Sequence, residues 1–349
     1  MRLLSIGDCV KPGSYRLHSC FKRAVNYVHR GRLVSVVDES IGPGPLNIVL
    51  RPWAVAAGIL PAVEGGILPP GVGIEPFRAS ARRQPVPPGR MPGSTAGKMP
   101  AATPRATAGI LRVGPGTILF AGRRYHFTSR QRYYSALELP AVAQSRLRRN
   151  LATFGEFLRK TAPPHSLAFL LDEGWLKCFR TGFARALAAQ IQQGAQQAFH
   201  GDLLKGVAEL KGCGVGLTPS GDDFIAGLLI GLNFLQKLHG SELQRLADAV
   251  CRAARGSSLF SNTAMELARQ GLLFGRVKEV LLALVSGNGP SLRRAVQKLL
   301  AVGASSGADL ATGLFLTLNQ PDKTLERWTT QTAAPKRAAR SGSAKIANS

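Results

Sequence analysis

The chain has 349 residues, of which 45% are hydrophobic, and its mean hydropathy of +0.03 is typical of a globular protein with one large domain or two modest ones. Its longest apolar run, Phe224 to Leu232, has nine residues and is far shorter than the roughly 20 that span a bilayer. The N-terminus lacks the pattern of a secretory signal. We therefore expect a cytoplasmic protein without a membrane span.

The formal net charge of +25 raises the question of nucleic-acid binding. Part of the excess lies in two low-complexity segments, 57–110 and 331–349, and no basic segment alternates with aromatic residues as a stacking surface requires. Five scattered cysteines without a CxxC pair predict reduced thiols rather than disulfides. The charge therefore favours small anions or an acidic partner subunit over nucleic acid.

The first 137 residues are predicted to form a β-rich domain. β-Branched and apolar runs predict strands near 33–37, 47–50, 110–113 and 117–120, whereas 17–26 fits either a short helix or an extended segment. Proline, glycine, alanine and arginine crowd residues 57–110, which show neither helical nor strand periodicity. We predict a disordered insertion there.

From residue 138 to 330 the pattern becomes helical. Apolar residues step at helical spacing from Leu147 to Leu158, and every fourth residue from Trp175 to Ile191 is apolar, which predicts two core-facing helices. Further helices are predicted near 202–210, 220–238, 241–255, 261–271, 275–286, 289–301 and 307–318, and 331–349 is predicted to be a disordered basic tail. The fold class is therefore α+β.

The sequence is dominated by Gly-Cys-Gly-Val-Gly-Leu-Thr-Pro-Ser-Gly-Asp-Asp at 212–223, which runs directly into the longest apolar segment. Two carboxylates beside such a segment need helix-end amides, a cation or a positive ligand to offset their desolvation. Glycine amides bind anions, and carboxylates bind Mg²⁺. The candidate catalytic residues are Thr218, Ser220, Asp222 and Asp223, with Gly214, Gly216 and Gly221 as substrate-binding residues and Asp222 and Asp223 as metal ligands.

Two readings of the helix start remain open, with Thr218 as N-cap before Pro219, or with Ser220 and Asp223 as a capping box. A purely structural alternative also remains, in which the aspartates complement the helix dipole and Gly227-x-x-x-Gly231 allows close packing. The motif is not a Walker A loop, because no Gly-Lys-Ser/Thr follows the glycines.

A partial repeat of the motif occurs at 306–314, where Ser-Gly-x-Asp-apolar-x-x-Gly-Leu recurs. The repeat predicts two helix starts that converge on one pocket, with Asp309 opposite Asp223 as a further metal ligand and with Ser306 and Gly307 as substrate-binding residues. Chance similarity of two small-residue helix caps is the alternative. The histidines show no metal-like spacing. His18, which has Ser19 and Asn26 as neighbours in the sequence, is a candidate substrate-binding residue, and so is Asn26.

The 212–223 motif, followed by Phe224 and Ala-Gly-Leu, closely resembles a bacterial family represented by the oxamate carbamoyltransferase subunit AllH. Segments outside the motif are similar to the same family, namely His18-Ser19 with Phe21 and Asn26, Gly42-Pro43 with Asn47, Ser261-Asn262-Thr263, and Ser305-Ser306-Gly307 with Asp309 and Gly313.

This resemblance implies a cytoplasmic subunit that works with FdrA-like and AllG-like partners in allantoin catabolism. The implied reaction is the Mg²⁺-dependent transfer of a carbamoyl group from oxalurate to phosphate, which yields oxamate and carbamoyl phosphate. It assigns no individual catalytic residues. A non-catalytic scaffold subunit, in which the motif packs helices and carries a partner, is the second hypothesis.

Overall fold

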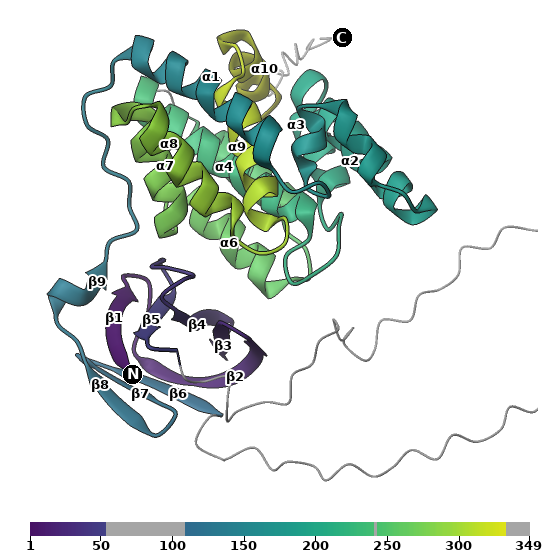
Figure 1. Ribbon diagram of the computed structural model, residues 1–349. Coiled ribbons are helices and arrows are strands. Elements are labelled where there is room, and N and C mark those ends of the chain that lie inside the picture. Colours follow the sequence, from purple (N-terminus) through teal and green to yellow (C-terminus); the bar gives the residue numbers. More distant parts are fainter. Residues whose placement is uncertain (54–108, 241–242, 333–349) are drawn as a thin grey trace, which may run out of the picture.

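The computed structural model describes residues 1–53, 109–240 and 243–332. Strands fill its first part and helices its second (Figure 1), which confirms the predicted α+β fold class. The insertion predicted at 57–110 lies outside the described residues except for its last two positions, and so does the tail from 333 onward.

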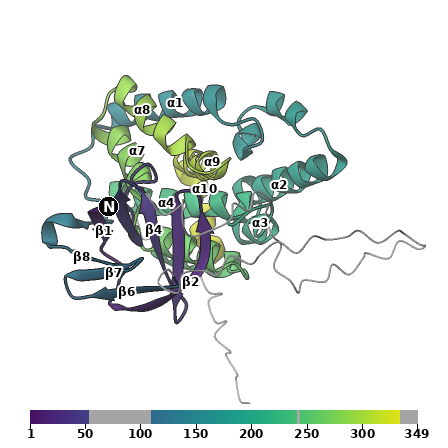
Figure 2. The same ribbon diagram turned by 60° about the horizontal axis from the view of Figure 1, so that its bottom comes forward.

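The strands form one curved nine-stranded sheet (Figures 1 and 2) in the order β8-β7-β6-β2-β3-β4-β5-β1-β9. Neighbouring strands run antiparallel, except that β4 pairs with β5 and β1 with β9 in parallel. The strands are β1 (Arg2–Gly7), β2 (Gly13–Phe21), β3 (Ala24–His29), β4 (Arg32–Asp38), β5 (Asn47–Arg51), β6 (Ile110–Gly114), β7 (Thr117–Phe120), β8 (Arg123–His126) and β9 (Arg132–Tyr133).

The four predicted strands are present as β4, β5, β6 and β7. The ambiguous segment 17–26 is extended and forms much of the β2–β3 hairpin. Its register shifts between Leu17 and Ser19, which leaves His18 as the extra residue of a β-bulge. Bulges change the direction in which a side chain points and are frequent beside active sites.

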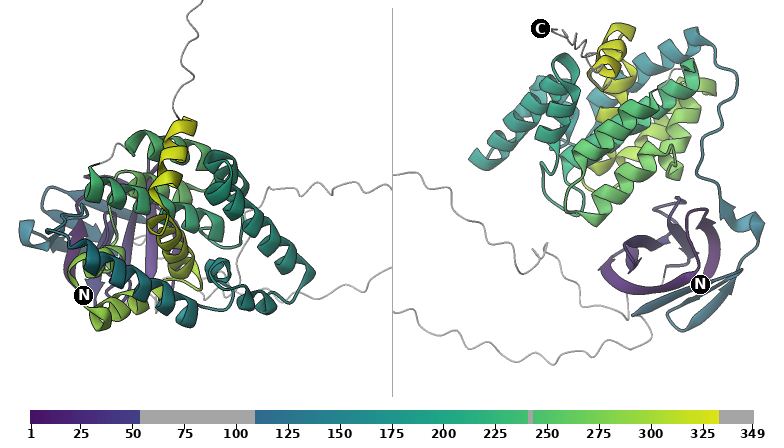
Figure 3. Two further views of the ribbon diagram at one scale, coloured as in Figure 1. Left: turned by 90° about the horizontal axis from the view of Figure 1, so that it is seen from above. Right: turned by 180° about the vertical axis from the view of Figure 1, so that it is seen from behind.

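Among the described residues, the short 3-10 turns η2 (Ser129–Gln131), η3 (Leu167–Leu170) and η4 (Glu173–Cys178) accompany the helices. The helices are α1 (Gln144–Thr161), α2 (Gly182–His200), α3 (Leu203–Leu210), α4 (Ser220–His239), α5 (Gln244–Ala254), α6 (Leu259–Arg269), α7 (Gly275–Ser286), α8 (Gly289–Leu300), α9 (Ser306–Leu318) and α10 (Asp322–Thr332). They stack on one side of the sheet, with α4 inside the bundle (Figures 1 and 3). Among the described helices none combines the length and the apolar character that a membrane crossing requires.

The buried helices α4 and α9 lie side by side and run in the same direction. A Cβ atom added at Gly227 would collide with the carbonyl oxygen of Leu310, and one added at Gly313 with that of Phe224. Further along both helices, Gly231 faces Thr317. The two helices therefore touch through their backbones, and both begin at the same end of the bundle.

Hydrogen bonds join the sheet to the helices near α7. The Tyr133 hydroxyl donates to the Leu273 carbonyl over 2.9 Å, and the Leu273 amide donates to the Ser135 carbonyl over 3.0 Å. Ser135 in turn donates its hydroxyl to Asp8, which follows β1. These bonds connect the last strand, the first strand and the helical part.

Two expectations about the helices need correction. The stripe from Trp175 to Ile191 does not lie on one helix, because η4 ends at Cys178 and Thr181 caps a new helix, α2, by accepting a hydrogen bond from the Ala184 amide. The break turns Phe183 outward, where it is 71% exposed. Helix α10 was not predicted, and it includes Gln331, the first residue of the predicted tail.

We predict that Gly313→Ala lowers the free energy of unfolding by about 1–3 kcal/mol, because the added methyl group collides with backbone of α4 that cannot move independently. Gly289→Ala is the matched control, since nothing lies within 4 Å of a Cβ atom added there. Denaturant unfolding measures both variants. Equal stability of the two variants would contradict the close crossing.

Candidate functional site

The glycine loop connects α3 to α4 and occupies residues 211–219. Gly214 and Gly216 have φ angles of 123° and 109°, which side chains other than glycine rarely adopt. No acceptor in the described protein takes a hydrogen bond from the backbone amides of 214–218. Val215 is 77% exposed. The loop therefore presents a row of free amides to solvent, an arrangement suited to an anion.

The start of α4 matches neither predicted cap. Pro219 precedes the helix and Ser220 is its first residue, and no side chain caps it. The Thr218 hydroxyl instead donates to Oδ2 of Asp223 over 3.0 Å. Neither predicted cap forms, because the buried carboxylate of Asp223 accepts the hydrogen bond of the Thr218 hydroxyl.

Asp222 is buried and its partner lies in the loop rather than in the neighbouring helix. Its Oδ1 accepts a hydrogen bond of 2.8 Å from the backbone amide of Gly212. Its charge also contributes to the raised pKa of the Cys213 thiol, although burial is the larger cause. Asp222 therefore ties the beginning of the loop to the first turn of α4.

Asp223 and Asp309 meet where α4 and α9 begin. Burial raises the pKa of Asp223 to about 7, against the opposing effect of hydrogen bonds from Ser306 and Thr218, and the negative charge of Asp309 raises it further. Burial likewise raises the pKa of Asp309 to about 6, while hydrogen bonds from the Leu167 amide, Ser220 and Ser305 lower it. The structure thus brings the two predicted helix starts together.

The starts of α4 and α9 interact reciprocally. Ser306, the first residue of α9, favours the charged form of Asp223, and Ser220, the first residue of α4, favours that of Asp309. Oδ1 of Asp309 accepts a 2.6 Å hydrogen bond from the Leu167 amide, whereas its buried Oδ2 has no partner of ordinary hydrogen-bond geometry in the described protein. An unsatisfied buried carboxylate oxygen is costly, and protonation or a bound cation would each offset that cost.

The two loops share one frame, meaning the same set of backbone hydrogen bonds at matching positions. The Cys213 amide donates to Leu210 as the Val302 amide does to Leu299, and the next bonds, Gly221 to Cys213 and Gly307 to Val302, match as well. Asp222 and Asp223 then donate to Pro219, as Ala308 and Asp309 do to Ser305.

Within this shared frame the loops differ in length. Five residues, 214–218, separate Cys213 from Pro219, whereas only 303–304 separate Val302 from Ser305. The extra length coincides with the free amides and with the two glycines of positive φ. Helix packing does not require it, because the second loop supports the same frame without it.

The sheet contributes a polar chain beside α6. Asn26 donates its side-chain amide to the Ser19 hydroxyl over 3.1 Å and accepts from Ser35 over 2.7 Å. The ring of His18 contacts Ser19 and packs edge-on against Phe260 of α6, with 5.2 Å between ring centroids.

Helix α6 links this chain to the glycine loop, since the Ser258 hydroxyl before it donates to the Leu217 carbonyl over 3.4 Å. The predicted site residues Thr218, Ser220, Asp223, Ser306 and Asp309 are therefore grouped directly, whereas His18 and Asn26 are connected to the loop through α6.

The side chains at the two helix starts suit Mg²⁺ chemically. Carboxylate and hydroxyl oxygens are its preferred ligands, and one or two carboxylates suffice when water or phosphate oxygens complete the shell. Asp223 and Asp309 fit this role, and the unpartnered Oδ2 of Asp309 supports it. Asp222 is engaged with the loop, and in the described ranges no three His, Cys, Asp or Glu side chains form a ready metal cluster.

Sequence reasoning missed two groups at this site. Ser305, whose hydroxyl lowers the pKa of Asp309, was named only among the segments similar to the family and not among the candidate site residues. The Leu167 amide comes from η3, 142 residues away in the chain, and a backbone donor leaves no signal in a residue pattern.

The fold and site define an α+β protein with two parallel helix starts, two buried carboxylates near them and an extended glycine loop. Residues 210–318, roughly a third of the chain, match the family model described as oxamate carbamoyltransferase subunit AllH. The match confirms the resemblance for both loops and the helices between them, and it does not extend to the strands. No curated protein and no solved structure matches the chain.

We predict that Asp309→Asn flattens the pH dependence of stability between about pH 4 and 7. The folded pKa values of Asp223 and Asp309 lie above the ordinary aspartate value of 3.8, so the native state binds more protons and loses stability as pH rises, by up to about 1.4 kcal/mol per pH unit for one group. Asparagine retains the acceptor for Leu167. Urea unfolding across this range measures the effect.

Asp322→Asn, at an exposed carboxyl on α10, is the control for that experiment. An unchanged pH profile in Asp309→Asn would show that the buried pair does not titrate in this window.

Proposed function

We propose that this chain is a subunit of a carbamoyltransferase that acts on oxalurate or oxamate and carbamoyl phosphate, and that the α4 and α9 starts bind the small anionic substrate with Mg²⁺. The observation that carries the proposal is the extension of the 214–218 loop over its counterpart at 303–304. An internal duplicate of the same frame does without it, so the extension has a purpose other than packing.

The anion is assigned to the loop amides. Glycine at 214 and 216 lets the main chain turn its N–H groups outward without a side chain in the way, and the positive end of α4 adds to the attraction. Carbamoyl phosphate and oxamate both carry compact negative charge. The same amides would stabilise charge that develops on the carbamoyl oxygen during transfer.

The metal is assigned to Asp223 and Asp309, with the hydroxyls of Thr218, Ser220 and Ser306 around them. Bound there, Mg²⁺ would neutralise phosphate oxygens and polarise the reacting carbonyl group. Asp222 holds the loop in place through Gly212 and so acts as a positioning residue.

Partner subunits are assigned to the exposed surface of the two loops. Val215, Leu217 and Val302 are exposed apolar residues beside the free amides. A subunit that covers them would exclude water from the anion site, which strengthens its electrostatics. The FdrA-like and AllG-like subunits implied by the resemblance are the proposed partners.

The scaffold alternative rests on burial, because Asp309 is fully buried and Asp223 is only 8% exposed. In that case the carboxyls stay protonated and serve packing alone. The two hypotheses differ in what the extended loop does, which permits a direct test.

Deletion of residues 215–217 gives the first loop the length of the second and tests the loop directly. We expect the melting temperature to stay within about 5 °C, since the shared frame survives, while calorimetric binding of carbamoyl phosphate in the presence of Mg²⁺ is lost. Retained binding by a folded deletion variant would contradict the proposal.

Asp223→Asn tests the metal. In the complex reconstituted with its partner subunits we expect at least about a hundredfold loss of Mg²⁺-dependent carbamoyl transfer, the scale seen when a key electrostatic group is removed. Stability should hold or rise, because a buried charge is removed. Asp202→Ala, which removes the cap of α3, is the control and should lower stability without affecting transfer.

A further inference from the structure

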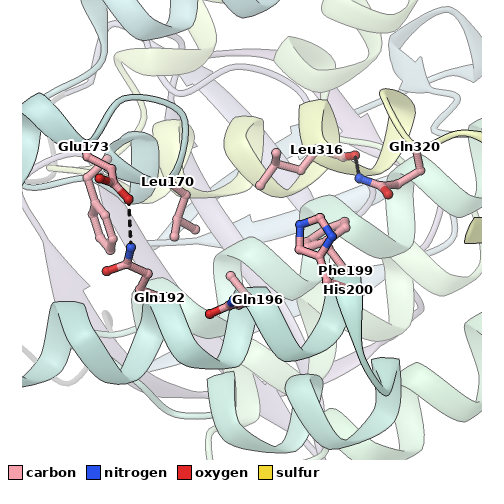
Figure 4. Close-up of a pocket in the computed structure, with 10 residues that line it drawn as sticks. Leu170, Glu173, Gln192, Gln196, Phe199, His200, Leu316 and Gln320 are labelled. Atoms are coloured by element: carbon pink, nitrogen blue, oxygen red, sulfur yellow. Dashed lines mark hydrogen bonds between the residues drawn. The ribbon is translucent and has the colours of Figure 1, made fainter.

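A surface cavity of about 320 Å³ lies at the other end of α9, where α2, η3 and η4 meet that helix (Figure 4). Phe169 and Phe199 line its apolar part. Glu173, Gln192 and Gln320 stand among the polar groups around it. Apolar walls with a few convergent polar groups are typical of small-molecule sites.

The hydrogen bonds of the polar side chains decide what they offer to a ligand. Gln192 donates Nε2 to Oε1 of Glu173 over 3.2 Å, and Gln320 donates Nε2 to the Leu316 carbonyl over 3.0 Å. These bonds fix the orientation of both amides, so their Oε1 atoms remain as acceptors. With the second oxygen of Glu173, three acceptors remain for a ligand.

The charge of the cavity points the same way. Glu173 is its charged residue, and none of the lining residues is lysine or arginine, although the chain as a whole carries a net charge of +25. A ligand that brings N–H donors and a positive charge would satisfy the acceptors and pair with the carboxylate. An anion would meet no lysine or arginine there, and the N–H donors open to it would be those of Gln196 and His200.

We propose that this cavity binds a compact organic cation that carries several N–H donors on a flat apolar body, namely an aryl amidinium. The apolar body contacts the apolar lining, to which Leu170 and Leu316 belong, and the donors face Glu173, Gln192 and Gln320. This site is distinct from the anion site at the helix starts, and it selects the opposite charge.

The cavity is connected to Asp309 through η3. The Leu167 amide donates to Oδ1 of Asp309, and Phe169 and Leu170 in the same four-residue turn line the cavity. A ligand that shifts this turn changes the hydrogen bond that holds Asp309. Regulation of transfer by the ligand rests on the proposed function, whereas binding itself does not.

Benzamidine and benzoate form the matched probe pair, because they share a ring and differ in offering donors with positive charge or acceptors with negative charge. On the full chain we expect calorimetric binding of benzamidine and at least tenfold weaker binding of benzoate. Glu173→Gln should weaken benzamidine at least tenfold, and Ala195→Trp, which fills the cavity, should abolish its binding. The amide NMR resonance of Leu167 should shift on benzamidine addition.

Benzoate binding as tight as benzamidine, or benzamidine binding unchanged in both variants, would overturn the proposal, as would no benzamidine binding at millimolar concentration. Circular dichroism and melting of each variant establish that it is folded. An inactive carbamoyl transfer assay would count against the proposed function alone, since the binding and the Leu167 shift are read without it.

Discussion

The backbone contact between α4 and α9 is the constraint on which the rest of the site depends. Glycine at 227 and 313 lets each helix reach the carbonyl groups of the other, so their axes approach closely and their starts fall side by side. Because the helices run in the same direction, both positive ends and both first-turn carboxylates occupy one region. A larger residue at either glycine would separate Asp223 from Asp309.

Bringing two carboxylates together inside a bundle is unfavourable, and the structure offsets the cost only in part. Hydroxyls from the opposite helix and one distant backbone amide stabilise the charges, yet the pKa values remain raised and one oxygen of Asp309 stays unpaired. Buried groups left in this condition are characteristic of functional sites rather than of packing. The same region adds an extended loop whose amides at 214–218 have no acceptor in the part of the chain that the structure describes.

Helix α9 connects the two regions that we propose as binding sites for ligands of opposite charge. Its first turn carries Asp309 near the glycine loop, while Leu316 in its last turn and Gln320 beyond its end border the cavity. The turn η3 contacts both, through Leu167 at one end and Leu170 at the other. On the opposite side of the loop, α6 carries Phe260 against the bulged His18 of the sheet.

The sequence by itself determined the fold class, the strands β4 to β7, most helices, and the repeat that relates 220–228 to 306–314. These features are local, because periodicity and Ser-Gly-x-Asp spacing are written along a continuous stretch of chain. It failed at Phe183, where a capped break replaced a continuous helix, and at α10, whose polar exposed face weakened the pattern.

Only the tertiary structure decided which groups meet. It separated Asp222, which holds the loop, from Asp223, whose pKa the charge of Asp309 raises, although Asp222 and Asp223 are adjacent in sequence. It also brought in Leu167 and exposed the loop extension as the difference between two otherwise equal frames. The physical reason is that successive helix positions point about 100° apart, and a contact between distant segments depends on packing, which residue spacing does not encode.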